Sequence, residues 1–458
     1  MVYRDEYFQD SFFGPPAVAR PLMVSGAGVH LTDIHGRRYL DASSGPVVAN
    51  IGHGNERVAD ALAHQARTLS FTSPRTTRHG PNAEFVARLI DLAGPPFDRA
   101  YLCSGGSDAM EAAVTWLRAE AVARGDASRT RVISCRPSYH GGTLAALAWS
   151  GDATAAAVYG PMAAPPRHIP APLTYRPAAG TTAEDSARAS VSALESAISD
   201  LGPENVLAFV FEPVGGVASG ANVPHPLFFT RAREICDAAG VSIVHDEVMS
   251  ASRTGRFLAG SHWADARPDL VALAKGLGAG YAPLAAILAP SERVDALAAA
   301  GGYTLGHTYN ANPIACAAGV AVLDEIREEG LLGNAEVQGN RLRRGLESLM
   351  GDHELIGDVR GRGLLLAVEL VLDRDRRTVP PARMGLTDRV RAAALDHGLL
   401  IYGRRTNDGV FGEWLMISPP LVVSGAEVDE LLDKLDATLR SIRQTIPRES
   451  KPEGGQSP

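Results

Sequence analysis

Lysine is rare in this chain of 458 residues, and one of its three lysines lies where an amine could act as a nucleophile. Lys451 falls in a Pro- and Gly-rich tail, and Lys434 falls in a charged segment predicted to be an exposed helix. Lys275 instead ends the apolar run 270–274 and precedes the glycine-rich stretch 276–280. Burial favours the neutral amine, which attacks carbonyl carbons, whereas arginine keeps its charge and cannot. The pattern indicates a catalytic amine, although a lysine reaching from a strand end to solvent would also produce it.

Short apolar runs alternate with amphipathic, Ala-rich stretches between about residues 99 and 290. This alternation predicts an α/β unit with a mostly parallel sheet. The predicted strands are 100–103, 132–135, 206–211, 241–244, 270–274 and 284–288, and the predicted helices are 109–124 and 226–239. Further helices are predicted at 313–329, 341–350, 387–397 and 426–446, with apolar runs at 364–372 and 415–417.

Polar residues follow five of these predicted strands. Ligands of an open parallel sheet bind outside the carboxyl ends of its strands, so we expect the five groups to converge on one crevice. In chain order they are Ser104–Ser107, Ser138–Gly142, Glu212, His245–Glu247 and Lys275.

Three of these groups, together with the neighbouring Val248, suit distinct parts of one ligand. Gly106 and Ser107 begin a predicted helix, where free N–H groups and the helix dipole bind phosphate, although many such pairs simply start a helix. Tyr139 offers an aromatic face, and Val248 an apolar contact, for a flat ring; both could equally be packing residues. Asp246 follows a buried strand and needs a cationic partner, such as a protonated ring nitrogen or a nearby arginine.

A phosphate, a flat ring with a protonatable nitrogen and an aldehyde that condenses with lysine describe pyridoxal phosphate (PLP). The order of the groups along the chain (phosphate loop, aromatic residue, aspartate, lysine) is more specific than any one of them. The sequence offers no CxxC pair, and we predict no metal site.

The chain resembles the class III (ω-amino-type) aminotransferases, PLP-dependent enzymes of fold type I. The resemblance extends from about residue 40 to 440. It rests on GGSDAMEA (105–112), YHGGT (139–143), FEPVGG (211–216), HDEV (245–248), RTG (253–255), ALAKGLGAGYAPLAA (272–286), GHTYNANPIACAAG (306–319), RGRGLLLAVEL (360–370) and SPPL (418–421).

The resemblance implies a large domain with a mostly parallel, seven-stranded sheet flanked by helices, and a smaller α+β domain. It also implies a homodimer with active sites at the interface. The implied roles are Lys275 as Schiff-base lysine and proton carrier, Asp246 at the pyridinium, Tyr139 and Val248 on the two ring faces, Gly106 and Ser107 at the phosphate, Glu212 and His140 near the cofactor, and Thr308 at the neighbouring subunit's phosphate.

The implied reaction moves an amino group from an amine or ω-amino acid to a keto acid, with pyruvate as one candidate, by a ping-pong mechanism. Another PLP reaction on the same scaffold, a decarboxylating transamination or an amino shift, is an alternative. A non-catalytic regulatory protein of this fold is a third interpretation, which the intact lysine, aspartate and phosphate loop disfavour.

At two positions, this chain differs from the family members that bind an α-carboxylate. Met416 stands where those members have an arginine, and Val217 where they have the glutamate that masks it. The pattern is closest to the amine or ω-amino acid:pyruvate branch, which uses a mobile arginine. Arg404 or Arg405 is predicted to bind the acceptor carboxylate, although both could be solvated loop residues. Val47 aligns with a pocket position that some amine transaminases fill with tryptophan.

The length predicts two or three structural units, and the pattern along the chain divides it further. They are an N-terminal segment (1–65) that packs with the small domain, a PLP-binding α/β domain (66–325), a small α+β domain (326–446) and a disordered tail (447–458). The net charge of −8 gives no support for nucleic-acid binding. No apolar run is long enough to span a membrane. Four dispersed cysteines without CxxC spacing favour a cytoplasmic protein with reduced thiols.

Overall fold

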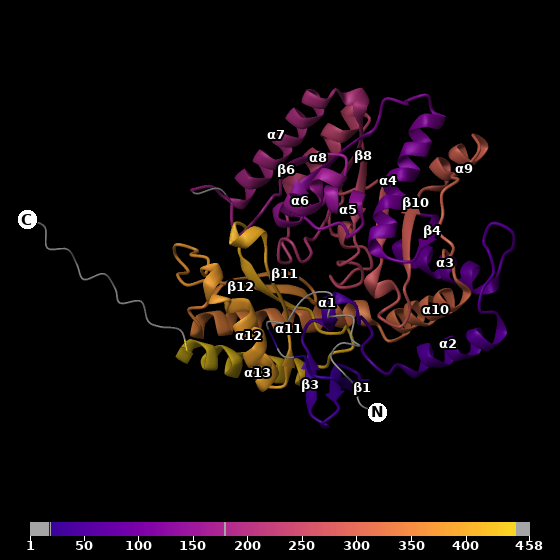
Figure 1. Ribbon diagram of the computed structural model, residues 1–458. Helices are drawn as coiled ribbons and strands as arrows, with labels where there is room; N and C mark the ends of the chain where they lie inside the picture. Colours follow the sequence, from indigo (N-terminus) through magenta and orange to yellow (C-terminus); the bar gives the residue numbers. More distant parts are fainter. Residues whose placement is uncertain (1–17, 19, 178–179, 446–458) are drawn as a thin grey trace, which may run out of the picture.

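The computed structural model describes residue 18 and residues 20–177 and 180–445. Figure 1 shows the middle of the chain, with α7, α8 and α4, in the upper part of the molecule. The indigo beginning and the orange to yellow end of the chain meet in the lower part. The predicted tail, 447–458, lies outside the described residues.

The upper part contains a seven-stranded sheet in the order β4-β10-β9-β8-β7-β5-β6. Only β10 runs against its neighbours, so the carboxyl ends of the other strands lie at one edge. This confirms the predicted α/β class and the mostly parallel sheet. The strands are β4 (Arg99–Cys103), β5 (Arg131–Arg136), β6 (Arg167–Pro170), β7 (Val206–Phe211), β8 (Ser242–Asp246), β9 (Leu270–Leu273) and β10 (Ala285–Ala289).

Helices cover both faces of this sheet, because successive side chains of a strand point to opposite faces. In β7, Phe209 and Phe211 contact Phe228 of α8, with ring centroids 6.3 and 5.2 Å apart. Ala208 belongs instead to the apolar cluster of Met110 in α4. The covering helices are α4 (Gly106–Ala123), α7 (Ala183–Leu201) and α8 (Pro226–Ala239).

Two four-stranded sheets form the lower part, in the orders β11-β12-β15-β14 and β1-β2-β3-β13. The second joins the two ends of the chain, since Leu40 of β3 pairs with Leu399 of β13. The predicted division into an N-terminal segment, a PLP-binding domain and a small domain, with boundaries near 65 and 325, stays a prediction. The strands are β1 (Met23–Ala27), β2 (His30–Asp33), β3 (Arg38–Asp41), β11 (Ile356–Arg362), β12 (Leu365–Leu370), β13 (Leu399–Leu400), β14 (Tyr402–Arg405) and β15 (Glu413–Ile417).

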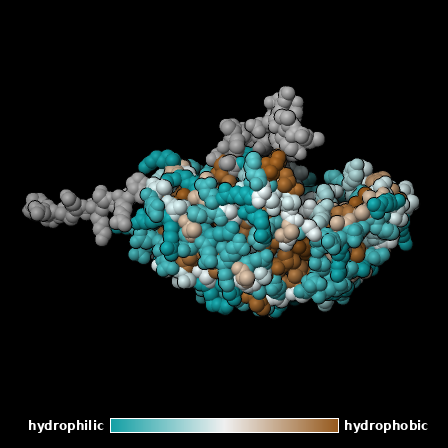
Figure 2. All heavy atoms as spheres, turned by 90° about the horizontal axis from the view of Figure 1, so that it is seen from below, coloured by the Kyte–Doolittle hydropathy of each residue, from teal (hydrophilic) through white to brown (hydrophobic). Residues whose placement is uncertain are grey.

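The remaining α-helices are α1 (Ser44–Val47), α2 (Glu56–Thr68), α3 (Gly80–Ala93), α5 (Leu144–Trp149), α6 (Ala153–Tyr159), α9 (Ser291–Ala299), α10 (Pro313–Glu328), α11 (Leu331–Asp352), α12 (Leu386–Asp396) and α13 (Gly425–Thr445). Short 3₁₀ turns are η3 (Gly160–Met162), η4 (Pro203–Asn205), η5 (Ala259–His262), η6 (Lys275–Leu277), η7 (Ala382–Met384) and η8 (Asn407–Gly409). The face seen from below is mostly hydrophilic, with small separate apolar groups (Figure 2). Within the described ranges, no helix has the length and apolar character needed to cross a bilayer.

The structure adds elements that the apolar pattern did not predict. Strands β6, β11 and β14 are short or rich in charged residues, so their pairing with neighbours decides their conformation. Helix α11 starts ten residues before the predicted one, at Leu331 rather than at residue 341. Its Gly339 packs on Gly363, where an added Cβ would lie 2.4 Å from the backbone carbonyl carbon. Gly339, which weakens the helical pattern in the sequence, therefore allows α11 to lie close to the backbone of Gly363.

Candidate active site

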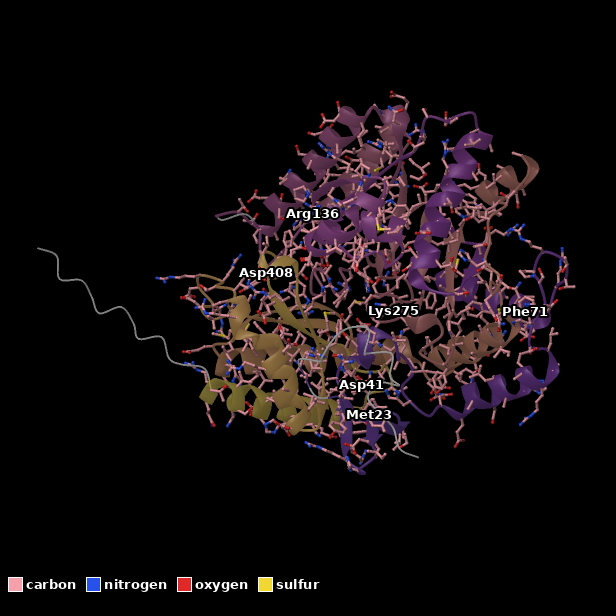
Figure 3. The ribbon with its side chains drawn as sticks, in the orientation of Figure 1. Met23, Asp41, Phe71, Arg136, Lys275 and Asp408 are labelled. Carbon is pink, nitrogen blue, oxygen red and sulfur yellow. The ribbon has the colours of Figure 1, made fainter. Side chains whose placement is uncertain are left out.

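Lys275 directly follows the short link after β9 and begins η6. Its backbone adopts the left-handed conformation, with φ of 47°. Such backbone is uncommon for residues with a side chain and occurs where the surrounding structure enforces it, often at functional sites. The next residue must be small, since a Cβ on Gly276 would lie 2.0 Å from Asn50 Nδ2. Figure 3 shows Lys275 near the centre of the molecule, where the upper and lower parts meet.

A cavity of about 420 Å³ surrounds Lys275. Residues after β4, β5, β7 and β9, together with the last residue of β8, line it, so the five expected groups converge as predicted from the sheet rule. Of the predicted cofactor contacts, the lining includes Gly106, Ser107, Tyr139, His140, Glu212, Asp246, Val248 and Lys275.

One end of the cavity is built by the first turn of α4. Gly106 is the first helical residue, and the Ser107 hydroxyl accepts a hydrogen bond from Gly142 N at 2.9 Å. A Cβ on Gly106 would lie 3.0 Å from Val248 Cγ1, so this position suits glycine. The free N–H groups and positive dipole end of this helix favour a bound anion.

Asp246 is held at the end of β8 by two donors. Its Oδ2 lies 2.8 Å from His140 Nδ1, and its Oδ1 accepts the Val248 N–H at 3.0 Å. Burial alone would lower the pKa of His140, but the hydrogen bond and charge of Asp246 outweigh burial and raise it. His140 Nε2 is buried and has no hydrogen-bond partner among the described residues. The hydrogen bonds from His140 and Val248 therefore fix the orientation of the Asp246 carboxyl group in the cavity.

The amine and a second carboxyl group both have pKa values shifted toward neutrality. Burial lowers the pKa of Lys275 to about 8, although the charges of Asp246 and Glu212 oppose that shift. Burial also raises the pKa of Glu212 to about 7, against the charge of His140. Glu212 Oε1 accepts the Gly216 N–H at 2.8 Å. The cavity thus contains an amine that becomes neutral, and so nucleophilic, at a lower pH than a free lysine does, together with groups able to exchange protons near neutral pH.

The structure does not bring Thr308 or Val47 into this cavity. Thr308 is exposed, whereas Val47 is buried in an apolar cluster with Met416 and Val217. Its neighbour Val48 lines the cavity instead. The backbone of Val47 is left-handed, with φ of 62°.

The two candidate arginines have different surroundings. Arg404 lies over the ring of Tyr139, with its Cζ 5.8 Å from the ring centroid, and it pairs with Asp152. Arg405 pairs with the buried Glu413 at 2.8 Å. Since successive residues of β14 face opposite ways, only Arg404 lies next to a residue of the cavity wall.

The cavity wall includes further residues to which the sequence analysis assigned no cofactor contact. Val48 comes from the N-terminal part, and residues 280 and 282–284 come from the loop after Lys275. The glycine-rich stretch after Lys275 signalled that loop, but no local pattern signalled Val48. Asp152 was also missed; an aspartate directly before an Ala-rich helix is a helix-cap signal and does not identify an ion-pair partner.

These residues fit pyridoxal phosphate. The α4 N-terminus suits a phosphate, Tyr139 and Val248 offer surfaces for a ring, Asp246 suits a protonated ring nitrogen, and the Lys275 amine suits an aldehyde. The orphaned His140 nitrogen shows that the polar groups of the cavity are not satisfied by protein alone. A side chain at position 106 would press against Val248, the residue assigned to one face of the ring.

Comparisons with known proteins agree with this chemistry. The family model of the class-III aminotransferases matches residues 16–439. The taurine–pyruvate aminotransferase of Bilophila wadsworthia is 31% identical over 440 residues, which cover 92% of this chain and 93% of that protein. The 4-aminobutyrate aminotransferase GabT of Escherichia coli is 34% identical over 414 residues, covering 90% and 92%.

A solved structure shows the same fold. The amine transaminase of an uncultivated Pseudomonas species, in its PLP-bound form, superposes with a TM-score of 0.86 at 31% identity, covering 92% of this chain and 95% of that one. The family model matches most of the chain, and the solved structure has the same fold. The chain belongs to the class III aminotransferases, enzymes of fold type I that use pyridoxal phosphate.

Proposed function

We propose that this aminotransferase takes its amino group from an amine or ω-amino acid and passes it to a keto acid, with pyruvate as the candidate acceptor. The observation that supports catalysis most directly is the half-buried Lys275, which lines one cavity together with Asp246. The donor class is supported by Val217 and Met416, which are buried in one apolar cluster. These two apolar residues occupy the positions at which the carboxylate-binding members have an arginine and the glutamate that masks it.

The roles of the residues follow from their chemistry. Bound PLP supplies an aldehyde that receives amines and a ring that accepts electrons. The Lys275 Nζ would take a proton from the donor carbon and return it to the cofactor carbon that carried the aldehyde, since a neutral amine is a competent base. Asp246 holds negative charge at the ring-nitrogen end, and Ser107 with the α4 N–H groups orients the phosphate. Donor and acceptor use the same cavity in turn, as ping-pong kinetics require.

A donor panel tests the proposed substrates. Purified holoenzyme is mixed with primary amines, ω-amino acids or α-amino acids, first alone and then with pyruvate or 2-oxoglutarate. The proposal predicts cofactor absorbance changes with the first two donor groups and recovery with pyruvate. Reaction confined to α-amino acids, or recovery with 2-oxoglutarate alone, would overturn the substrate assignment while leaving the family unaffected.

Arg404 is the residue that we propose for the acceptor carboxylate. Replacing it by alanine removes a charge-assisted hydrogen bond of about 1.5–3 kcal/mol, so the KM for pyruvate should rise about 10- to 100-fold. The Arg405→Ala variant is a matched control: it should keep the wild-type KM but lose stability, because it leaves the buried Glu413 without its cation. Steady-state kinetics and thermal melting distinguish the two variants. An unchanged KM in Arg404→Ala would contradict the assignment.

The shifted pKa of Lys275 predicts how the apoenzyme takes up PLP. The rate of covalent attachment should rise with pH and reach its midpoint near 8, because burial lowers the pKa of this amine from 10.5 to about 8. In the folded chain, the Lys275 amine is protonated below about pH 8 and neutral above it. Between the two values the unfolded chain binds more protons, so the apoenzyme should also gain stability as pH rises through this window.

Stopped-flow absorbance of apoenzyme mixed with PLP measures the attachment rate. A lysine derivative in free solution provides the reference for the ionisation of PLP itself. A midpoint that coincides with that reference would show that the cavity does not activate the amine.

We also propose a homodimer with Thr308 directed at the partner's phosphate site. Exposed apolar residues flank Thr308: Leu305 and Tyr309 are 55% and 67% exposed. Phe71 lies 6.1 Å from Tyr309 between ring centroids, and Figure 3 shows it at the outer edge of the molecule. A second copy would bury this surface. A single-chain mass in sedimentation would exclude the dimer.

A cytoplasmic location is proposed as well. Its support is the four cysteines, which are all free and buried. Fractionation of the native cells, with the protein recovered outside the cytoplasmic fraction, would refute this location.

A further inference from the structure

Arg404 already has a carboxylate partner within the chain. Its Nη2 lies 2.5 Å from Asp152 Oδ2, although the two residues are 252 positions apart in sequence. The side chains are 26% and 10% exposed, so water screens this pair only in part. Any substrate carboxylate that binds Arg404 therefore competes with Asp152.

Asp152 is fixed independently of Arg404. Its other oxygen, Oδ1, caps α6 by accepting the N–H groups of Thr154 and Ala155 at 3.0 and 3.2 Å. The backbone on either side of it is tied to Asn407 of η8: Asn407 Oδ1 accepts Ala153 N–H at 2.7 Å, and Asn407 Nδ2 donates to Gly151 O at 3.2 Å. If Arg404 moves away, this carboxylate stays in place.

The Arg404 side chain is held less firmly. Its backbone lies in β14 and pairs with Trp414 of β15, but its guanidinium makes a single hydrogen bond to the described residues, the one to Asp152. The face of Tyr139, a residue of the cavity wall, provides its other contact. A long side chain with one ionic anchor can exchange partners by rotation about its own bonds.

We propose that Asp152 is a specificity-determining residue that competes with the keto-acid carboxylate for Arg404. This inference rests on the proposed function of Arg404. When the cavity holds an amine without a carboxylate, Asp152 neutralises the guanidinium and no unpaired cation faces an apolar donor. When a keto acid enters, its carboxylate replaces Asp152. The masking anion thus comes from the cap of α6, since position 217 is the apolar Val217.

The Asp152→Asn variant tests this competition, because asparagine caps a helix as well as aspartate does but has no charge. The KM for pyruvate should fall about fivefold, the amount expected for a partly exposed ion pair. The Kd of holoenzyme for propionate, a carboxylate without a keto group, should fall by the same factor in calorimetry. A melting temperature lowered by no more than about 2–4 °C, the loss expected from the ion pair alone, shows that α6 remains capped.

Two further variants separate this switch from other effects. Asp408→Asn removes the same charge from η8, but Asp408 pairs with Arg405, so its KM for pyruvate should stay at the wild-type value. In an Arg404→Ala background, Asp152→Asn should leave the KM and the propionate Kd unchanged, because there is no guanidinium left to release. An equal fall in Asp408→Asn, or a fall without Arg404, would indicate a general charge effect and overturn the proposal.

The failures of the two proposals are distinguishable. If Arg404→Ala leaves the KM for pyruvate unchanged, Arg404 does not bind the acceptor and the proposed carboxylate site is wrong. If Arg404→Ala raises the KM but Asp152→Asn leaves it unchanged or raises it, the carboxylate site stands. In that case Asp152 does not compete for it, and only the present inference is wrong.

Discussion

Replacing Lys275 by alanine is expected to lower the turnover number by at least about 10⁴-fold. The reason is that one amine is assigned two tasks, holding the aldehyde of PLP and moving the proton between carbons, and no described residue of the cavity can replace it. Steady-state kinetics with an amine donor and pyruvate measure the loss. PLP can still bind to the variant through its phosphate and ring contacts, so the expected defect is in chemistry rather than in cofactor content.

The scarcity of lysine makes a direct test of the attachment site possible. Borohydride reduction of the holoenzyme, followed by peptide mapping, should place the pyridoxal adduct on Lys275, one of only three lysines. The Lys434→Ala variant is the matched control, since this residue of α13 pairs with Glu430 and lies outside the cavity. Its turnover should be that of the wild type. An adduct on another lysine would refute the assignment of Lys275.

Replacing Asp246 by asparagine is expected to lower the turnover number by about 10²- to 10⁴-fold. Removing one partner of a buried charge pair costs about 3–5 kcal/mol, and each 1.4 kcal/mol is about a factor of ten in rate. The shape of the residue is kept, and its bonds to His140 Nδ1 and Val248 N can still form. The loss therefore reports the missing negative charge opposite the ring nitrogen.

Glu247 offers the control for this prediction, because it is the neighbouring buried carboxylate. It accepts hydrogen bonds from Ala259 N and Gly260 N and does not line the cavity. The Glu247→Gln variant should lose stability in thermal melting but keep most of its turnover at a temperature where it is folded. If both variants lost turnover equally, the effect of Asp246→Asn would reflect general damage to this segment.

Much of the site could be predicted because it depends on strand ends. The run 206–211 predicts β7 with the observed bounds, since a short, fully apolar run suits a strand buried on both faces. Once five such strands share a direction, their following residues lie at one edge whatever the details of packing. This is why Lys275 and Asp246 could be brought together without knowledge of any contact between them.

The positions of the residues proposed to bind substrate could not be predicted in the same way. Arg404 and Arg405 are neighbours in sequence, and only the register of β14 with β15 decides which of them faces Tyr139. The partner of Arg404 comes from a distant helix cap, which no local pattern connects to β14. Val47 illustrates the same limit, because it lies in an apolar cluster while its neighbour Val48 lines the cavity.

The amino-acid sequence by itself determined the class of the sheet, the order of the polar groups along it and the amine that PLP requires. These properties follow from local periodicity and from residue type, which act over a few neighbouring positions. Only the tertiary structure decided the ion pair of Arg404 with Asp152, the place of Val47 and the extent of α11. Each of these depends on surfaces from distant segments meeting at short range, and the free energy of such contacts is not encoded in either segment alone.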